Sequence, residues 1–410
     1  MILFRKKMTL SPGQRHLAAD LQILFLAVLA GFSLVICLEG LIHLYLDKGG
    51  GVDFYSAYLV AARHLLNGQS PYTNLPAGPI AAQTYGAYFY PPTFAWFLIP
   101  FLCLSQLNAT LLWLGLQITL LVTAVWLAAM SAGAKKTLRL VLALIVATLF
   151  FVPTYDALGG GNVGIIITLG VALLLWSTLT HPEGHFLPAP LVTALGILKL
   201  TPGLLLLPLL VANPRRNLKL AGLTLVLLVG PFFLLNPGSW LDYLRIPFSL
   251  ITGDGWYFNN LAPTTVFAYY WPAVAGLEPL IRLLTIGGVL ILLGASLNLA
   301  HRPAGLPAAL MTAYVASLLL SGTLWGNYFE ALLPGVIITW IWSGKWGRIL
   351  ITVAYLVAWV GFFLTPPLET IGLLMLGLTI IQILRWPKKL QVSDIKSAEG
   401  STSEFFGQRA

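Results

Sequence analysis

The sequence predicts an all-α protein, a polytopic bundle of about twelve transmembrane segments with additional helices lying at the exoplasmic membrane surface. Its composition is the first observation: of 410 residues, 58% are hydrophobic and only 9% are charged. Soluble domains are usually about 45–50% apolar and about 25% charged. The second observation is that the apolar residues form long runs, and about 20 such residues cross a hydrocarbon core of about 30 Å. An ordinary water-soluble protein is therefore excluded.

The net charge of +9 could indicate a nucleic-acid partner. The cations, however, stand in short clusters between apolar runs and do not share one face, so no nucleic acid is expected. Lys and Arg accumulate in cytoplasmic loops of membrane proteins. We therefore expect the clusters at 135–139, 215–219, 345–348 and 385–389 to be cytoplasmic.

The first apolar run extends from Leu21 to Leu46 and is too long for a signal-peptide core, which predicts an uncleaved helix with a cytoplasmic N-terminus. Residues 91–104 are expected to form a shallow or re-entrant helix. Proline and glycine at 202–203 predict that the run 187–212 crosses twice, as a hairpin with its tip at Lys199. Further apolar runs lie near 107–131, 138–153, 162–179, 218–235, 279–300, 306–322, 328–343, 348–364 and 369–385.

With this assignment both termini are cytoplasmic. Residues 1–388 are expected to form a single transmembrane domain with exoplasmic loops at 47–90 and 236–278. Residues 389–410 are polar and are expected to be a disordered cytoplasmic tail.

Several acidic residues fall on or near the exoplasmic side, where polar groups in apolar segments suggest function. They include Asp53, Asp156, Glu330 and Glu369. Asp53 follows a glycine-rich turn and precedes an amphipathic helix that is expected to end at Asn67 and Gly68. Two interpretations of Asp53 remain open at this point, namely a helix N-cap and a catalytic or substrate-binding group.

Lys199 is the strongest candidate for binding an anion. It stands alone between Leu198 and Leu200, where it either snorkels to the membrane surface or pairs with an anionic headgroup or phosphate. Arg63 and His64 are weaker candidates for the same phosphate contact, and a histidine in such a position is more often a solvated surface residue.

Tyrosines and polar islands form the remaining candidate substrate-binding positions. Tyrosines at headgroup level are ordinary membrane anchors, but as a group they could line a carbohydrate or prenyl groove. No metal-ligand spacing, phosphate loop or nucleophile elbow is found, so neither a metal nor a cofactor is expected. The candidates are Tyr55, Tyr58, Tyr90, Asn162, Asn259, Asn260, Trp325 and Asn327.

Five segments, taken in order, form a fairly specific set, namely Asp53 to Tyr58, Gly68 to Tyr72, Tyr90 to Phe94, Lys199 to Gly203, and Trp325 to Pro334. Together they resemble the GT-C superfamily of membrane glycosyltransferases, and most closely glycosyltransferase family 87, the polyprenyl-phosphate-mannose-dependent mannosyltransferases. The resemblance covers about residues 20–385.

The resemblance implies a helical GT-C fold with its active site at the exoplasmic face and Asp53 as the general base of an inverting transfer. The implied partners are a polyprenyl-phosphate-linked sugar donor, a lipid-linked or cell-envelope acceptor and the bilayer. A lipid phosphate leaves as an anion, so a nearby cation is useful, and Lys199 is the first choice.

This chain departs from the family pattern at two places. It has Gly161-Asn162-Val163-Gly164 where the family usually shows Gly-Gln-x-Asn, and Asn327 where the family often has histidine. Asn327 cannot carry a charge, so another group or a different substrate is implied.

The alternative class is a lipid or small-molecule transporter or flippase, which would place polar residues near the midplane, often with repeat symmetry. Here the polar islands gather at one face and no strong repeat is seen. These two features favour a transferase, with another lipid-phosphate transferase as a further possibility.

Overall fold

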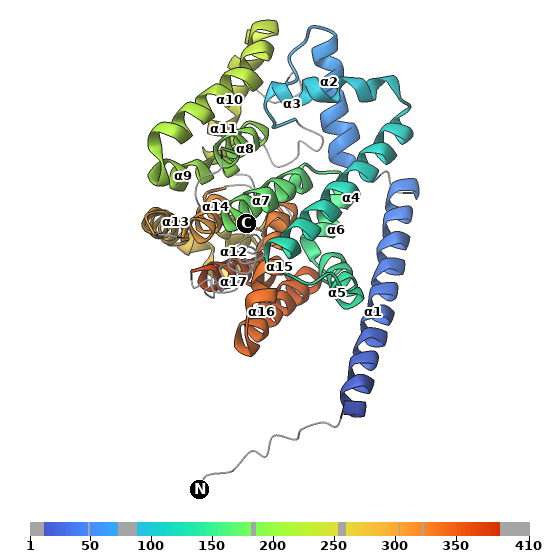
Figure 1. The fold of residues 1–410 in the computed structure, drawn as a ribbon. Helices are drawn as coiled ribbons and strands as arrows, with labels where there is room; N and C mark the ends of the chain where they lie inside the picture. Colours follow the sequence, from blue (N-terminus) through green and yellow to red (C-terminus); the bar gives the residue numbers. More distant parts are fainter. Residues whose placement is uncertain are drawn as a thin grey trace, which may run out of the picture.

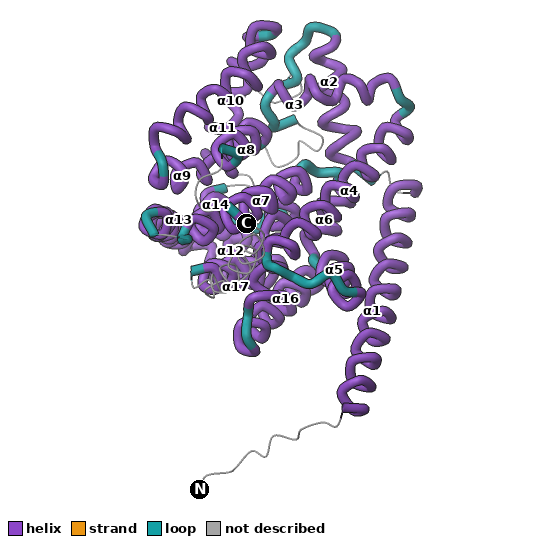
Figure 2. The backbone as a smooth tube through the Cα atoms, in the orientation of Figure 1, coloured by secondary structure: helices purple, strands orange, loops and turns teal. Residues whose placement is uncertain are grey.

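The computed structural model describes residues 12–47, 50–72, 88–181, 186–252, 260–302, 304–321 and 324–385. Every regular element in these ranges is a helix and none is a strand. In Figure 2 the described backbone is accordingly coloured as helix, with loops between the helices. The predicted all-helical class is therefore confirmed. The expected disordered tail at 389–410 lies outside the described residues.

The helices of the first half include those formed by the predicted apolar runs, although α1 begins at Pro12, ahead of the run that starts at Leu21. They are α1 Pro12–Asp47, the π-helix η1 Asp53–Tyr58, α2 Leu59–Leu66, α3 Pro92–Leu98, the 3-10 helix η2 Ile99–Cys103, α4 Gln106–Ser131, α5 Leu138–Leu149, α6 Val152–Gly160, α7 Gly164–Thr180, α8 Pro188–Leu198, the 3-10 helix η3 Thr201–Leu205 and α9 Leu206–Ala212.

The second half has the same character, with proline in the first turn of several helices, where it is tolerated. Its elements are α10 Pro214–Leu235, α11 Pro237–Thr252, α12 Pro263–Tyr270, the 3-10 helix η4 Pro272–Leu277, α13 Glu278–Ala300, α14 Leu306–Leu320, the 3-10 helix η5 Gly326–Leu332, α15 Leu333–Trp342, α16 Lys345–Leu364 and α17 Pro366–Leu384.

Six described helices are long and apolar enough to cross a membrane, namely α1, α4, α10, α13, α16 and α17, so the chain is a multi-pass membrane protein. A seventh span results if α5 and α6, which meet at a bend of 67°, are counted together. The expected number of about twelve crossings is not confirmed. Other apolar runs form helices of 10–17 residues, short of the roughly 20 that a straight crossing requires.

The run 187–212 is broken at the expected place. α8 ends at Leu198, Lys199 is extended, and η3 and α9 follow. The two arms approach closely, since a Cβ added to Gly196 would lie 3.1 Å from the Cα of Gly203. The break at Lys199 is thus confirmed, and a double crossing of the membrane stays a prediction.

Helix α1 lies along the outside of the molecule, where it contacts α5 and α6 (Figure 1). Its large apolar side chains Leu24, Phe25, Val28 and Phe32 are exposed. Water would penalise this arrangement, whereas lipid would not, so these side chains mark a surface that faces the hydrocarbon core.

The segment η1–α2 supports the site described below, and its predicted amphipathic pattern is confirmed. Phe54, Tyr58 and Leu65 are buried, whereas Arg63 is exposed. The ring of Phe54 stacks on Trp113 of α4, with centroids 4.9 Å apart and planes 10° apart. This packing holds the start of η1 against α4.

Candidate active site

Two glycine-rich turns place Asp53 against the end of α6. The backbone N–H of Gly51 donates to the carbonyl of Gly159 at 2.8 Å. Gly161 has a φ of +69°, and a Cβ there would lie 3.0 Å from the Cα of Gly51. Only residues without side chains allow this close approach. Asp53, two residues after Gly51, is thereby brought beside α6.

Asn162 holds the Asp53 carboxylate. Its Nδ2 donates to Asp53 Oδ2 at 2.7 Å and to the hydroxyl of Tyr90 at 3.3 Å. Its Oδ1 accepts from the backbone N–H of Gly164 at 2.9 Å, which fixes the orientation of the amide so that the N–H groups face Asp53. Tyr58 in turn donates to the Tyr90 hydroxyl at 3.1 Å.

Asp53 is not the cap of its helix. The N-cap position of η1 is Val52, and no side chain caps the helix there. The interpretation of Asp53 as an N-cap is therefore wrong, and its carboxylate serves a long-range contact instead.

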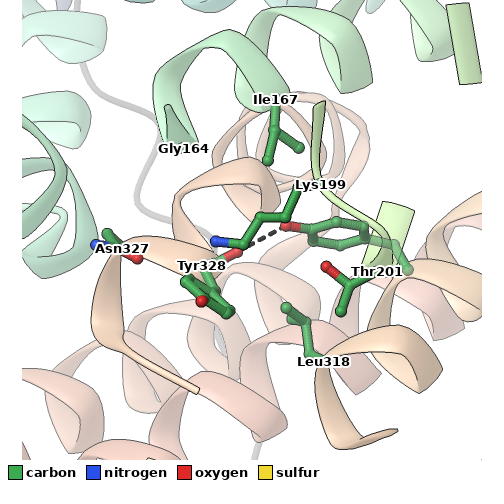
Figure 3. Close-up of a pocket in the computed structure, with 8 residues that line it drawn as sticks. Gly164, Ile167, Lys199, Thr201, Leu318, Asn327 and Tyr328 are labelled. Carbon is green, nitrogen blue, oxygen red and sulfur yellow. Dashed lines mark hydrogen bonds between the residues drawn. The ribbon is translucent and has the colours of Figure 1, made fainter. Parts of the chain in front are cut away.

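Lys199 lines a cavity that lies next to the hydrogen-bond network of Asp53, Asn162 and Tyr90. Its Nζ is buried and has no hydrogen-bond partner, and it sits over the ring of Tyr328 at 2.9 Å from the centroid (Figure 3). The ring centroid of Tyr90 is 6.0 Å from the same Nζ. A buried ammonium is costly unless it is paired. The rings offset part of that cost, and the free N–H groups suit an anion. The cavity is lined by Gly164, Ile167, Lys199, Thr201, Tyr314, Leu318, Asn327 and Tyr328.

Asp53 and Lys199 influence each other electrostatically. Burial raises the pKa of Asp53, while the hydrogen bond from Asn162 and the positive charge of Lys199 lower it. Burial pushes the pKa of Lys199 well below its ordinary value, and the negative charge of Asp53 opposes this. Each group therefore favours the charged form of the other inside a poorly solvated site.

Three further carboxylates, one of them Glu330 of η5 itself, lie on or beside η5 and were only part of the general acidic pattern in the sequence. Asp156 Oδ2 accepts from the backbone N–H of Asn327 at 2.9 Å. The Thr154 hydroxyl bonds to Glu330 at 2.9 Å. A Cβ on Gly326 would lie 3.0 Å from Asp156 and 3.4 Å from Glu369. The spacing of Asp156 ahead of the triple glycine was the signal that could have singled it out.

The candidate substrate-binding residues in the second half of the chain differ in whether they line the cavity of Lys199. Asn327 lines it, is 5% exposed, and its Oδ1 has no hydrogen-bond partner. Trp325 precedes η5 and contacts the ring of Tyr328 at 6.2 Å between centroids. Asn260 is buried elsewhere, and its Oδ1 accepts from the backbone N–H of Leu324 at 2.9 Å. Asn259 lies outside the described residues.

The N-terminal candidates divide in the same way. Tyr55 is partly buried beside Asp53 and packs on the core. Arg63 is exposed on α2, and His64 is half-buried. Neither residue lines the cavity that contains Lys199. Within the described ranges, no three His, Cys, Asp or Glu side chains come together as a metal site.

A sequence comparison matches the family described as glycosyltransferase family 87 over residues 88–325, more than half of the chain. The chain belongs to glycosyltransferase family 87. This family 87 member is thus a membrane glycosyltransferase, as the resemblance predicted. The comparison with curated proteins gives no match. The family match contains Asn162 and Lys199, whereas Asp53 precedes it, and the hydrogen bond between Asn162 and Asp53 joins the two parts.

Proposed function

We propose that this protein transfers a hexose, with mannose as the first candidate, from a polyprenyl-phosphate-linked donor to a lipid-linked or cell-envelope acceptor. The observation that supports this proposal is the pair of Asp53 and Lys199. One is a partly buried carboxylate held by Asn162, and the other is a cation whose buried Nζ has no hydrogen-bond partner in an adjoining cavity.

The proposed reaction uses the atoms of this pair that have no hydrogen-bond partner in the described residues, Asp53 Oδ1 and Lys199 Nζ. Asp53 uses Oδ2 to accept from Asn162, and among the described residues its Oδ1 accepts no hydrogen bond. Oδ1 takes the proton of an acceptor hydroxyl while that oxygen bonds to the anomeric carbon, with inversion. The bond from that carbon to the phosphate oxygen breaks, and the polyprenyl phosphate leaves with the electron pair. Lys199 stabilises the departing anion.

The site is proposed to face the exoplasm, with both termini in the cytoplasm. Support comes from the basic clusters at 135–139, 215–219, 345–348 and 385–389, which mark the opposite side. A polyprenyl-phosphate donor fits this location because its lipid keeps the sugar at the membrane. A reporter fused between α11 and α12, within the segment 236–278, tests the orientation, and a cytoplasmic signal there would contradict it.

The activity is tested by incubating purified protein with radiolabelled polyprenyl-phosphate mannose and a membrane lipid extract. We expect transfer of label, and a fall of about 10²–10⁴-fold in kcat for Asp53→Asn, which removes the base and keeps the shape. Glu278→Gln is the matched control, because Glu278 pairs only with Arg282 in the described contacts, on an exposed part of α13. Unchanged labelling by Asp53→Asn would remove Asp53 as the base. No labelling from any polyprenyl-phosphate sugar would favour the transporter.

A further inference from the structure

Two junctions between helices lie next to each other, the one from α4 to α5 and the one from α15 to α16. The indole Nε1 of Trp342, at the end of α15, donates to the carbonyl of Ala132, just after α4, at 3.2 Å. The hydroxyl of Tyr355 in α16 donates to the carbonyl of Ala147 in α5 at 2.6 Å, and these two helices lie side by side in Figure 1. Counted along the helices, α5 and α16 each begin about 14–15 Å before this second bond, so the two junctions lie at the same level.

This level is that of the lipid headgroups. Both α4, which ends at the first junction, and α16, which begins at the second, are long and apolar enough to cross a membrane. A third such helix, α17, ends beside them, since a Cβ on Gly347 would lie 3.5 Å from Ile383. The ends of three spans therefore meet at one membrane surface, which the proposed orientation makes the cytoplasmic one.

Exposed cations gather at these helix ends without a carboxylate. Three extended residues span at most about 11 Å, so Lys135 and Lys345 lie close to the bond between Ala132 and Trp342. Residues 54–155 and 331–368, which include α4, α5, α15 and α16, contain no Asp or Glu. In the part of the chain that the structure describes, none of these cations forms an ion pair. The exposed cations are Lys135, Lys136, Arg139, Lys345, Arg348 and Arg385.

Membrane orientation explains only part of this arrangement. Lys and Arg set the side of the membrane, whereas Asp and Glu contribute little, so orientation does not require that carboxylates be missing. Like charges separated by about one Debye length, about 10 Å at 0.1 M salt, still repel each other. An anion bound among the cations would remove that repulsion.

Tryptophans accompany two of these cations. Lys136 Nζ lies 6.0 Å from the ring centroid of Trp126, and the guanidinium carbon of Arg348 lies 5.9 Å from that of Trp340. The two tryptophans are 37% and 41% exposed. Indoles at headgroup level have an apolar body that suits acyl chains and a polar N–H. A soluble polyanion would use only the cations, whereas a phospholipid matches the cations and the indoles.

The start of α16 supplies further hydrogen-bond donors. No side chain caps this helix, so the N–H groups of its first turn have no acceptor within it. Ser343, just before the helix, is 8% exposed, yet its Oγ has no hydrogen-bond partner, although buried hydroxyls are nearly always satisfied. The hydroxyl lies against the first turn, because a Cβ on Gly347 would be 2.6 Å from it. Beside Lys345, these donors suit a phosphate.

We propose that this surface, formed by the α4–α5 and α15–α16 junctions, binds an anionic phospholipid. The headgroup phosphate lies between Lys135 and Lys345 and accepts from the start of α16, and the acyl chains pass the exposed indoles of Trp126 and Trp340. The lipid thereby joins the end of α4 to the end of α15.

Both helices also support the candidate active site. Trp113 of α4 stacks on Phe54, and α15 directly follows η5, which carries Asn327 and Tyr328. The bound lipid therefore stabilises the two helices that hold the site together. This role is independent of which donor and acceptor the enzyme uses.

Nanodiscs of defined composition test the site. Purified full-length protein is placed in phosphatidylcholine discs that contain increasing fractions of phosphatidylglycerol, and the thermal midpoint is measured. Ligands that bind the folded state raise this midpoint, so we expect it to increase with phosphatidylglycerol. Native mass spectrometry should show phosphatidylglycerol retained on the protein. An unchanged midpoint in the wild-type protein, with no retained phosphatidylglycerol, would overturn the inference.

The double variant Lys135→Gln with Lys345→Gln places the lipid. Each cation near a membrane surface contributes about fivefold to binding an anionic lipid, so we expect half of the effect to need at least about tenfold more phosphatidylglycerol. Lys135→Arg with Lys345→Arg keeps both charges and should behave as the wild-type protein does.

The matched control is Arg215→Gln with Lys219→Gln. It removes the same charge from another exposed basic cluster, at the start of α10, which packs on α8 and α9. This control should respond to phosphatidylglycerol as the wild-type protein does. Equal responses of the two glutamine double variants would overturn the inference, because the effect would then follow overall charge.

Inorganic phosphate separates the lipid from a free anion. Protein in neutral detergent should keep its thermal midpoint when phosphate replaces chloride at constant ionic strength, and phosphatidylglycerol added to the same micelles should raise it. Equal stabilisation by inorganic phosphate would assign the surface to a soluble anion and overturn the lipid.

Discussion

The carboxylate of Asp53 and the carboxamide of Asn162, which are 109 residues apart in the sequence, are joined by a hydrogen bond of 2.7 Å. This bond links η1, which precedes the residues matched by the family, to the loop after α6 within them. Because Asn162 is itself fixed by Gly164, the carboxylate is held without a charged partner in direct contact. Asp53 therefore keeps one free oxygen for chemistry.

Asn162→Asp tests this relationship. The substitution keeps the shape and the acceptor for Gly164, but it replaces two N–H donors by a second negative charge near Asp53. A like charge raises the pKa of Asp53, so the base is protonated at higher pH. We expect kcat/KM to fall at least about tenfold at neutral pH and to recover as pH rises. A pH profile identical to that of the wild-type protein would contradict the role given to Asn162.

The wild-type pH profile is a second prediction. Burial raises the pKa of Asp53, so activity should be lost as pH falls through a value above about 3.9, the usual pKa of aspartate. Burial lowers the pKa of Lys199, so the cation and the activity should be lost as pH rises through a value well below about 10.4. The profile of kcat/KM against pH should therefore be bell-shaped.

Lys199→Arg tests whether deprotonation of Lys199 causes the loss of activity at high pH, the alkaline limb of the profile. A guanidinium stays charged beyond about pH 12, so this variant should lose the alkaline limb and keep the acid limb. An alkaline limb that remains in the arginine variant would show that another group is titrating.

Local sequence patterns were sufficient to predict helices in the apolar runs, but not α11 and α12, which lie in the segment 236–278 that was expected as a loop. The apolar run 107–131 forms α4, and the amphipathic helix predicted after Asp53 is present, with Phe54, Tyr58 and Leu65 on its buried face. Hydropathy and helical periodicity depend on neighbouring residues, so they can be identified along the chain. The break at Lys199 was found for the same reason, because proline and glycine mark it locally.

The site was only partly predictable, because its contacts join distant segments. Asp53 and Lys199 could be selected as charges in apolar surroundings, but nothing local indicates that Asn162 bonds to Asp53 or that Asn327 holds Asp156. These contacts depend on how η1, α6 and η5 pack. The number of crossings was not confirmed for a related reason: apolarity does not distinguish a short buried helix such as α14 from a lipid-facing span.

Lys199→Met separates the contribution of Lys199 to stability from its contribution to function. The substitution removes a buried ammonium that has no hydrogen-bond partner, and a thioether packs well on the ring of Tyr328. We expect the free energy of unfolding to rise by about 1–3 kcal/mol, seen as a higher thermal midpoint in detergent. Donor KM should rise or transfer should be lost, because the phosphate loses its cation. A less stable variant would show that Lys199 supports the fold.

Gly161→Ala tests the close approach that positions Asp53. Gly161 and Gly133 both have positive φ, +69° and +73°, so alanine costs about 1–2 kcal/mol of backbone strain at either position. At Gly133 a Cβ meets nothing within 4 Å, whereas at Gly161 it would lie 3.0 Å from the Cα of Gly51 and 3.2 Å from the Cβ of Phe54. Backbone cannot yield there without moving η1. We therefore expect Gly161→Ala to lower the thermal midpoint more than Gly133→Ala and to reduce kcat. Equal losses of stability, with kcat unchanged in both variants, would mean that this contact does not position Asp53.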